Sequence, residues 1–227
     1  MKRLLENDLP AFYCVGRRCT CCENITSESE FDLTEDDTQF VVEYQKGYAS
    51  FCGNSFNLSV VNYDTYIGNF TGTKIAEGRL RCDFILTDSD ADNIIILCEV
   101  TSSMGGIENL SRPIEKKKKD GTIEVAFPKG KYQKAELQLY QSLDTINSVP
   151  TISSYIKQKK RKVCLMSYLI TQTENVAVKA FNRNRLTEAE EAGENGAQIS
   201  CPQIEQFGFD YFRISHAYSF KIDKNSK

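Results

Sequence analysis

The sequence predicts a layered fold of the α/β or α+β class, and three observations lead to this prediction. Runs rich in β-branched and aromatic residues, typical of strands, occur at residues 79–87 and 93–101, and a further apolar run lies at 163–171. Between them, residues 131–146 carry apolar side chains at three- and four-residue spacing, which is the pattern of an amphipathic helix. Helices and strands that follow one another in this way bury their apolar faces by stacking in layers.

The leading part of the chain gives weaker signals. Residues 1–30 carry four cysteines and little hydrophobic periodicity, so we expect an irregular segment there. Thr34 followed by three acidic residues is typical of a helix start, and apolar residues then recur at helical spacing, which predicts a helix over 35–51. Residues 58–61 are expected to form a strand.

The central part contains two predicted hairpins. Residues 79–87 and 93–101 are joined by a polar turn, DSDAD, and this arrangement favours a β-hairpin. A second, exposed hairpin is expected within 107–128, where Asp120 and Gly121 follow the lysine run at 116–119. The helix at 131–146 and the strand at 163–171 come next. A short surface helix at 187–194 and a last strand at 208–222 complete the order.

Composition limits the class of protein. The chain has 227 residues, 41% of them hydrophobic, and a net charge of −3, which excludes collagen-like and wholly disordered chains. We expect an irregular segment at 1–30, one domain at 31–222 with a hairpin insertion near 104–128, and a tail at 223–227. The longest apolar run is too short to cross a bilayer, Pro10 interrupts any signal-peptide core, and the nine cysteines read as reduced thiols. A cytoplasmic protein with no membrane partner is expected.

Two carboxylates stand within the apolar runs of the first hairpin. Asp83 lies in the middle of the run at 79–87, and Glu99 lies near the end of the next run. A buried carboxylate is costly unless it is paired or binds a metal, and carboxylate oxygens on neighbouring strands are suitable ligands for Mg²⁺. Such an ion can activate water and neutralise charge on a phosphodiester. The alternative is that strand alternation turns both acids to a solvated face.

These residues resemble the PD-(D/E)XK nuclease superfamily. The similarity rests on residues 77–86 (EGRLRCDFIL) and 94–101 (IIILCEVT), because the family holds its divalent metal with an Asp on one hairpin strand and an acid two residues before a Lys on the next. Residues 136–140 (ELQLY) are similar to the Gln-Leu-x-x-Tyr motif of the exonuclease branch. The resemblance extends from residue 35 to about 171. It implies a restriction-endonuclease-like αβββαβ core, with a central mixed sheet flanked by helices.

The resemblance also implies an activity. It implies hydrolysis of phosphodiester bonds in DNA, dependent on Mg²⁺ or Mn²⁺, by an endo- or exodeoxyribonuclease of a restriction or phage-defence system. Asp83 and Glu99 are then the metal ligands, and Glu136 and Tyr140 form the helix wall of the site. Glu136 is either a third metal ligand or a residue of the helix surface. Glu43 and Glu77 are weaker candidates for a further acid.

Two positions depart from the family pattern. Cys82 stands where the family has its proline, which has no catalytic task. Thr101 stands at the position of the lysine that orients and polarises the attacking water, and a hydroxyl supplies a hydrogen bond but no positive charge. Either a lysine from elsewhere fills this place, or the site cuts poorly or not at all. On the helical wheel Lys134 points away from the border that carries Glu136 and Tyr140, and Lys131 lies on the other side of the apolar stripe.

Alternative functions follow from these departures and from the cysteines. One is a catalytically inactive, nuclease-like subunit that binds DNA or assembles with a protein partner in a larger complex. Another is an interaction protein that holds Zn²⁺ at Cys14, Cys19, Cys21 and Cys22, although their spacing lacks the paired C-x2-C arrangement. The sequence leaves the oligomeric state open.

Two further patterns in the sequence suggest other binding sites. Asp88, Asp90, Asp92 and Glu99 match positions 1, 3, 5 and 12 of a calcium-binding EF-hand loop, but Asn93 occupies the position that requires glycine, so a polar β-turn is favoured. The basic runs at 116–119 and 157–162 are either phosphate contacts or solvated charges.

Overall fold

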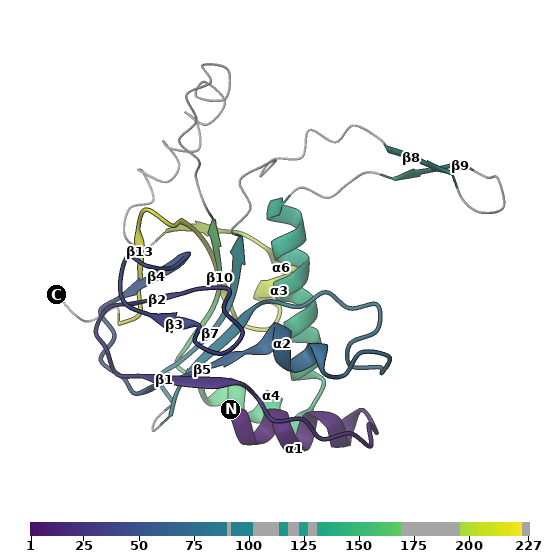
Figure 1. The fold of residues 1–227 in the computed structure, drawn as a ribbon, viewed down its shortest axis with the longest axis horizontal. Helices are drawn as coiled ribbons and strands as arrows, with labels where there is room; N and C mark the ends of the chain where they lie inside the picture. The colour runs from purple at the N-terminus through teal and green to yellow at the C-terminus, as the bar shows by residue number, and fades with distance from the viewer. Residues whose placement is uncertain (90–91, 102–113, 118–122, 127–130, 169–195, 224–227) are drawn as a thin grey trace.

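The computed structural model describes residues 1–89, 92–101, 114–117, 123–126, 131–168 and 196–223. Its main element is a mixed sheet of seven strands, and helices pack against one face of it (Figure 1). Across this sheet the strands run in the order β1 (Glu23–Thr26), β5 (Leu58–Asn62), β6 (Phe84–Asp88), β7 (Ile94–Thr101), β10 (Arg161–Tyr168), β12 (Asp210–Ser215) and β11 (Ala197–Ile199). The chain is therefore of the mixed α/β class.

The direction of the strands changes in the middle of the main sheet. Neighbouring strands are antiparallel from β1 to β7, whereas β10 is parallel to both β7 and β12. The parallel step from β7 to β10 needs a long crossover. The described part of this crossover contains α3 (Lys131–Asn147), α4 (Pro150–Gln158) and a separate two-stranded ribbon of β8 (Ile114–Lys117) and β9 (Ile123–Ala126).

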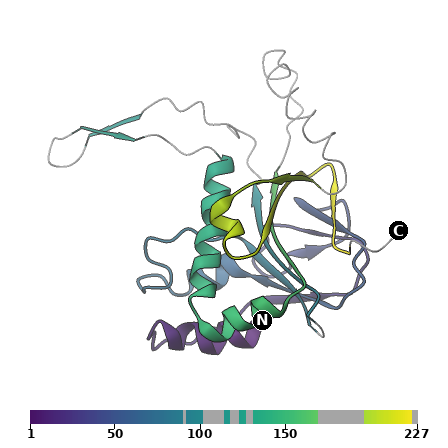
Figure 2. The same ribbon diagram turned by 180° about the vertical axis from the view of Figure 1, so that it is seen from behind.

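The two faces of the main sheet are covered differently. One face packs against α1 (Lys2–Phe12), α2 (Tyr63–Gly68), α3, α4 and α6 (Pro202–Glu205). The other face packs against a small sheet with the order β13 (Ser219–Lys221), β4 (Ala49–Cys52), β2 (Phe31–Leu33) and β3 (Val41–Val42). Figure 2 shows the same layers from behind, with α3 on one side of the main sheet and the small sheet on the other. Because both faces are covered, β7 is buried from Ile94 to Val100 and its sequence is continuously apolar except at Glu99.

Several predicted elements are confirmed. Strands at β5, β7 and β10, the helix α3 and the pairing of β8 with β9 lie where the sequence placed them. Strand β6 begins at Phe84 rather than at residue 79, and the predicted last strand is split into β12 and β13 by a turn in which Tyr218 N–H donates to Ser215 C=O. The predicted helix at 187–194 lies outside the described residues.

Two predictions at the amino-terminal end are wrong. Residues 35–51 form β3, β4 and turns instead of a helix, because Asp36 accepts hydrogen bonds from the backbone N–H groups of Thr38 and Gln39 and so closes a turn. Residues 2–12 form α1 instead of an irregular segment. Leu5 and Leu9, one helical turn apart, are fully buried in the helical face of the core, so this segment is part of the domain.

Within the described residues, no helix combines the length and the apolar character that a membrane span requires.

Candidate active site

Asp83 and Glu99 face each other across neighbouring strands. The β6–β7 register pairs Phe84 with Cys98, so one further step sets Asp83 opposite Glu99. Both residues alternate in phase with Ile85 and Leu97, which pack in the helical face of the core. The two acids therefore share the face of the sheet that α3 covers.

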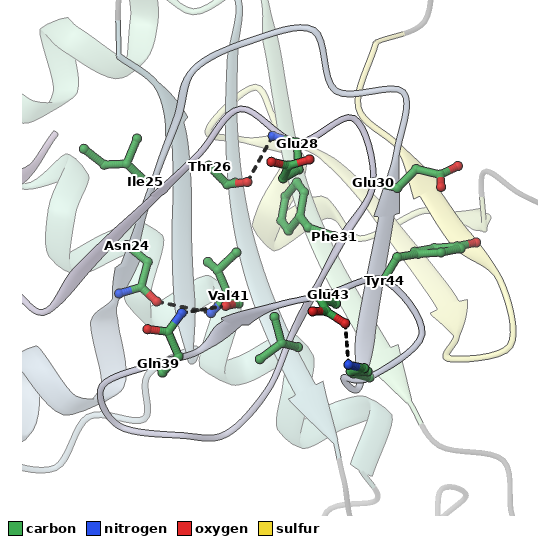
Figure 3. A pocket seen from close by; sticks show the side chains of 12 residues that line it. Asn24, Ile25, Thr26, Glu28, Glu30, Phe31, Gln39, Val41, Glu43 and Tyr44 are labelled. Atoms are coloured by element: carbon green, nitrogen blue, oxygen red, sulfur yellow. Dashed lines mark hydrogen bonds and ion pairs between the residues drawn. The ribbon is translucent and has the colours of Figure 1, made fainter.

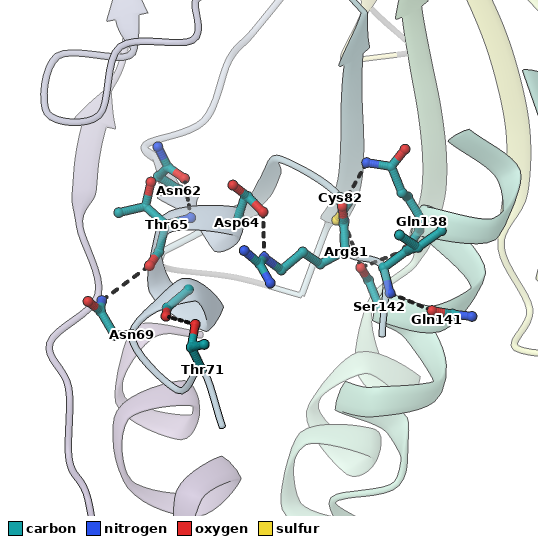
Figure 4. Close-up of polar contacts among 12 residues, drawn as sticks. Asn62, Asp64, Thr65, Asn69, Thr71, Arg81, Cys82, Gln138, Gln141 and Ser142 are labelled. Atoms are coloured by element: carbon teal, nitrogen blue, oxygen red, sulfur yellow. Dashed lines mark hydrogen bonds and ion pairs between the residues drawn. The ribbon is translucent and has the colours of Figure 1, made fainter. Parts of the chain in front are cut away.

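Side chains of α3 hold the segment that leads into Asp83. Residues 80–82 make no strand pairing, and their peptide groups bond to α3 instead (Figure 4). The bonds run from Leu80 N–H to Gln141 Oε1 (2.6 Å), from Gln138 Nε2 to Arg81 C=O (2.9 Å), and from Cys82 N–H to Ser142 Oγ (2.9 Å). Because three successive residues are tied to one helix, the position of Asp83 is set by α3.

Asp83 is fixed from two further directions. Its carboxylate accepts the backbone N–H of Val100 at 2.6 Å, which ties it to β7 directly beside Glu99. Its carbonyl oxygen accepts the N–H groups of Tyr63 at 2.7 Å and Asp64 at 3.2 Å, at the start of α2. Asp64 in turn forms an ion pair with Arg81. The side chain of Asp83 is thereby placed between α2, α3 and β7.

Burial raises the pKa of both carboxyl groups. Burial raises the pKa of Asp83 to about 7, the charges of Asp64 and Glu35 add to this, and the Val100 N–H opposes it. Burial also raises the pKa of Glu99 well above its usual range, and the Asp83 charge raises it further. Glu99 is only 6% exposed, and its Oε2 has no hydrogen-bond partner. A divalent cation bound between the two acids would offset the cost of burying their charges and would also give the unsatisfied oxygen of Glu99 a partner.

A lysine approaches this pair from α3. The positive charge of Lys134 lowers the pKa of Glu99, and a hydrogen bond from Gln138 acts in the same direction. Lys134 is exposed and lies one helical turn before Gln138, so both residues occupy the same side of the helix. Thr101 ends β7, half-buried, in register with Tyr168. The ammonium group near Glu99 thus comes from the helix and not from the strand.

Glu136 and Tyr140, on the border of α3 that the helical wheel indicated, contact other parts of the fold. Glu136 is turned toward β12, where its carboxylate forms an ion pair with Arg213 (2.5 Å). Tyr140 lies one helical turn after Glu136, and the centre of its ring is 6.2 Å from that of Phe207, which follows α6. The structure therefore brings Asp83, Glu99 and Gln138 together, with the charge of Lys134 acting on Glu99, while Glu136 and Tyr140 make their contacts elsewhere.

The weaker candidates lie apart from this site. Glu43 is exposed and forms an ion pair with Lys46 beside the small sheet, and Glu77 is exposed in a turn. The calcium-loop pattern is not realised, because the buried carboxylate of Asp88 accepts the N–H groups of Asn93 and Ile94 and pairs with Lys159 at 2.9 Å. Asp90 lies outside the described residues.

The cysteines do not converge. Cys14 is exposed, Cys21 is buried, and the thiol of Cys22 contacts the carbonyl oxygen of Asp37 at 3.2 Å. Among the described residues, no group of three or more His, Cys, Asp or Glu side chains is arranged to hold a metal ion. A metal at Asp83 and Glu99 would therefore complete its ligand shell with water or substrate oxygens, as Mg²⁺ commonly does.

The basic run at 157–162 serves the fold in large part. Lys159 is buried against Asp88, Arg161 donates to the carbonyl oxygens of Lys221 and Ile222, and Lys162 donates to the carbonyl oxygen of Lys159. The other run, at 116–119, extends beyond the described residues. The basic sequence of 157–162 is thus explained by internal bonds.

A sequence signal for the missed residues exists in α3. Lys134, Gln138 and Ser142 follow one another at four-residue spacing along one border of the apolar stripe. Such a polar line beside a buried face indicates groups that bond to whatever the helix covers.

Comparison of the chain with protein-family models, with curated proteins and with solved structures gives no match.

Proposed function

We propose that this protein is a metal-dependent nuclease of the PD-(D/E)XK type, which hydrolyses phosphodiester bonds in DNA in a restriction or phage-defence setting. The observation that carries the proposal is the facing pair of Asp83 and Glu99, with the buried, unsatisfied Oε2 of Glu99. The core strands support it: β5, β6 and β7 are antiparallel, and after α3 and α4 the chain returns in β10 parallel to β7, as the βββαβ part of the restriction-endonuclease-like core would require, with α2 and the β8–β9 ribbon as additions.

The residues of the pair fit a hard divalent cation. Both offer carboxylate oxygens, which Mg²⁺ and Mn²⁺ prefer, and burial, followed by neighbouring negative charges, raises their pKa values, an effect that a cation would offset. When bound, such an ion supplies an activated water and neutralises charge on the phosphate. Asp83 and Glu99 would hold it.

Gln138, Lys134 and Thr101 would position the two acids and polarise the attacking water. Gln138 joins Glu99 to the carbonyl oxygen of Arg81, so it keeps the two acids in one geometry. Lys134 would orient the attacking water and stabilise negative charge that develops on the phosphate, the task for which Thr101 lacks a positive charge. The Thr101 hydroxyl can contribute one hydrogen bond at the end of β7.

Cleavage of supercoiled and linear DNA with Mg²⁺ or Mn²⁺ tests the proposal. Asp83→Asn and Glu99→Gln should each lower the cleavage rate by about 100-fold or more, while Glu136→Gln, which changes an acid of α3 that pairs with Arg213, should stay within about threefold of wild type. Cleavage that survives in both Asp83→Asn and Glu99→Gln would refute the assignment of the metal site.

The role of Lys134 has its own test. Lys134→Ala should reduce cleavage by about 10- to 100-fold, and adding Thr101→Lys to this variant should restore activity because it returns an ammonium group to the strand position. Lys157→Ala, an exposed lysine on α4, is the control. If Lys134→Ala cuts at the wild-type rate, the lysine assignment is wrong.

The half-buried Thr101 at the lysine position favours one other function, an inactive nuclease-like subunit that binds DNA or assembles with a partner. It predicts that wild-type protein shifts DNA on a gel and leaves it uncut with either metal ion.

A further inference from the structure

A groove of about 640 Å³ lies on the small-sheet side of the molecule, between β1 and β3 (Figure 3). These are edge strands of the two different sheets, β1 of the main sheet and β3 of the small one. We call it the β1–β3 groove. One end is closed by side chains, because Asn24 Oδ1 accepts the N–H of Val41 and Gln39 Nε2 donates to the carbonyl oxygen of Val41.

The groove is acidic at its rim and apolar inside. Glu28, Glu30 and Glu43 line it, and the one lysine of the lining, Lys46, is already paired with Glu43. Its apolar lining is supplied by Phe31, Val41, Val42 and Ile25, and Ile25 is 62% exposed. Every charged residue between positions 23 and 43 is acidic, so this face repels phosphate and would not hold nucleic acid.

The backbone of β1 offers hydrogen bonds toward the open side. The carbonyl oxygen of Cys22 accepts the N–H of Asn62, and in an antiparallel ladder this bonded pair recurs every second residue, at Asn24 and Thr26. The N–H and C=O of Ile25 therefore point away from β5, toward the free edge. An extended chain can pair with such an edge and gain main-chain hydrogen bonds.

We propose that the β1–β3 groove binds an extended segment of a protein partner that alternates basic and apolar residues. Its backbone adds to the edge of β1, its apolar side chains contact Val41 and Val42 of β3, and its lysine or arginine side chains meet Glu28, Glu30 and Glu43. This proposal is independent of the nuclease activity.

Binding is tested with a fluorescein-labelled peptide of alternating lysine and valine, measured by fluorescence anisotropy on the full chain. A glutamate–valine peptide is the control probe and should bind at least about tenfold more weakly. Glu28→Lys combined with Glu30→Lys should weaken binding of the basic peptide about tenfold or more, and the same charge change at two distant exposed acids, Glu77→Lys with Asp210→Lys, should change it less than about threefold.

Strand addition is tested at Ile25. Ile25→Pro removes the outward N–H, leaves the β1–β5 ladder intact and should weaken peptide binding about tenfold, whereas Ile25→Val should bind as wild type does. A thermal midpoint close to that of wild type shows that the Ile25→Pro variant folds. If this variant does not fold, the peptide binding of the Glu28 and Glu30 double variant decides whether the groove is the binding site.

Three results would overturn the proposal. They are equal binding of the two peptides, equal weakening by the groove and control double variants, and full binding by a folded Ile25→Pro variant. Self-association of the chain that is lost in the Glu28 and Glu30 double variant would assign the groove to a second copy instead.

Discussion

At the scale of single residues, the chemistry of Asp83 and Glu99 arises from where the fold places two ordinary side chains. Burial raises the pKa of both, and the charge of Asp83 raises the pKa of Glu99 further. Asp83 accepts the N–H of Val100, but it is buried beside Glu99, whose Oε2 has no hydrogen-bond partner, so the two acids are poorly stabilised as a pair of anions. The pair is therefore a local cost to the fold that a bound cation would offset.

This cost predicts how stability depends on pH. The pKa of Asp83 is about 7 in the folded chain and about 4 when unfolded, so in this window the folded chain binds a proton that the unfolded chain has released. The free energy of unfolding measured without metal should therefore fall as pH rises from about 4 through 7, and Glu99 acts in the same sense.

Asp83→Asn isolates the effect. It removes the ionisable group while keeping an oxygen for the Val100 N–H, so at about pH 8 it should raise the free energy of unfolding by about 1–3 kcal/mol, with little gain near pH 4. Urea unfolding at the two pH values measures this. A variant that is less stable than wild type at pH 8 would show that the carboxylate is satisfied in the folded chain.

At the scale of elements, α3 acts as the scaffold of the site. The helix packs with Ala135, Leu139, Leu143 and Ile146 buried, and its polar border binds the backbone of residues 80–82. Strand β6 starts at Phe84 because the preceding peptide groups are bonded to this helix and not to a neighbouring strand. The spacing of apolar residues was sufficient to predict the helix, but not the segment its polar border holds.

Ser142→Ala tests this role of α3. It leaves the buried N–H of Cys82 without its acceptor and should lower the free energy of unfolding by about 1–3 kcal/mol, and it should also weaken cleavage because Asp83 follows directly. Ser148→Ala, at the exposed end of the helix, is the matched control and should change stability by about 0.5 kcal/mol or less. Equal effects of the two variants would show that the Cys82 bond contributes little.

The small sheet depends on a close approach at one glycine. A Cβ at Gly47 would lie 2.4 Å from the carbonyl oxygen of Leu33 and 2.6 Å from Cβ of Asp32. Gly47 N–H also donates to the buried carboxylate of Asp32 at 2.7 Å. These contacts explain why residues 43–48 form a turn against β2 and cannot continue the helix that the hydrophobic spacing predicted.

Gly47→Ala should therefore cost about 2–4 kcal/mol of stability, because the backbone of β2 has to move to admit the methyl group. Gly16→Ala is the control, since a Cβ there meets nothing within 4 Å. Thermal and urea unfolding of both variants measures the difference. A Gly47→Ala protein as stable as the control would mean that the turn shifts freely.

At the scale of the whole molecule, a buried ion pair joins distant parts of the chain at the end of the sheet away from the acid pair. Asp88 of β6 and Lys159, which follows α4, are both buried, and their charged groups lie 2.9 Å apart. The Lys159 ammonium also lies over the ring of Tyr155. The pair ties the β6–β7 hairpin to the entry of β10. Such a buried pair fixes the relative position of the two segments more than it adds to the free energy of unfolding.

Lys159→Met should lower the free energy of unfolding by about 3–5 kcal/mol, because Asp88 is left charged and buried without its partner. Adding Asp88→Asn should recover part of this loss, and neither change should alter metal binding by the folded protein, since the site lies near the other end of β7. Denaturant unfolding and Mg²⁺ titration of both variants measure these effects. A Lys159→Met protein of wild-type stability would show that water reaches Asp88.

Local pattern alone determined β7, α3 and β10, because their apolar runs are long and strongly periodic, and it pointed to Asp83 and Glu99 as acids out of place in such runs. Tertiary structure alone decided that these two share a face, that Lys134 and Gln138 approach them while Glu136 turns to Arg213, and that residues 35–51 form strands. The reason is physical: a run of side chains encodes the period of its own element, whereas burial, ion pairing and shifted pKa values depend on distances between residues far apart in the chain.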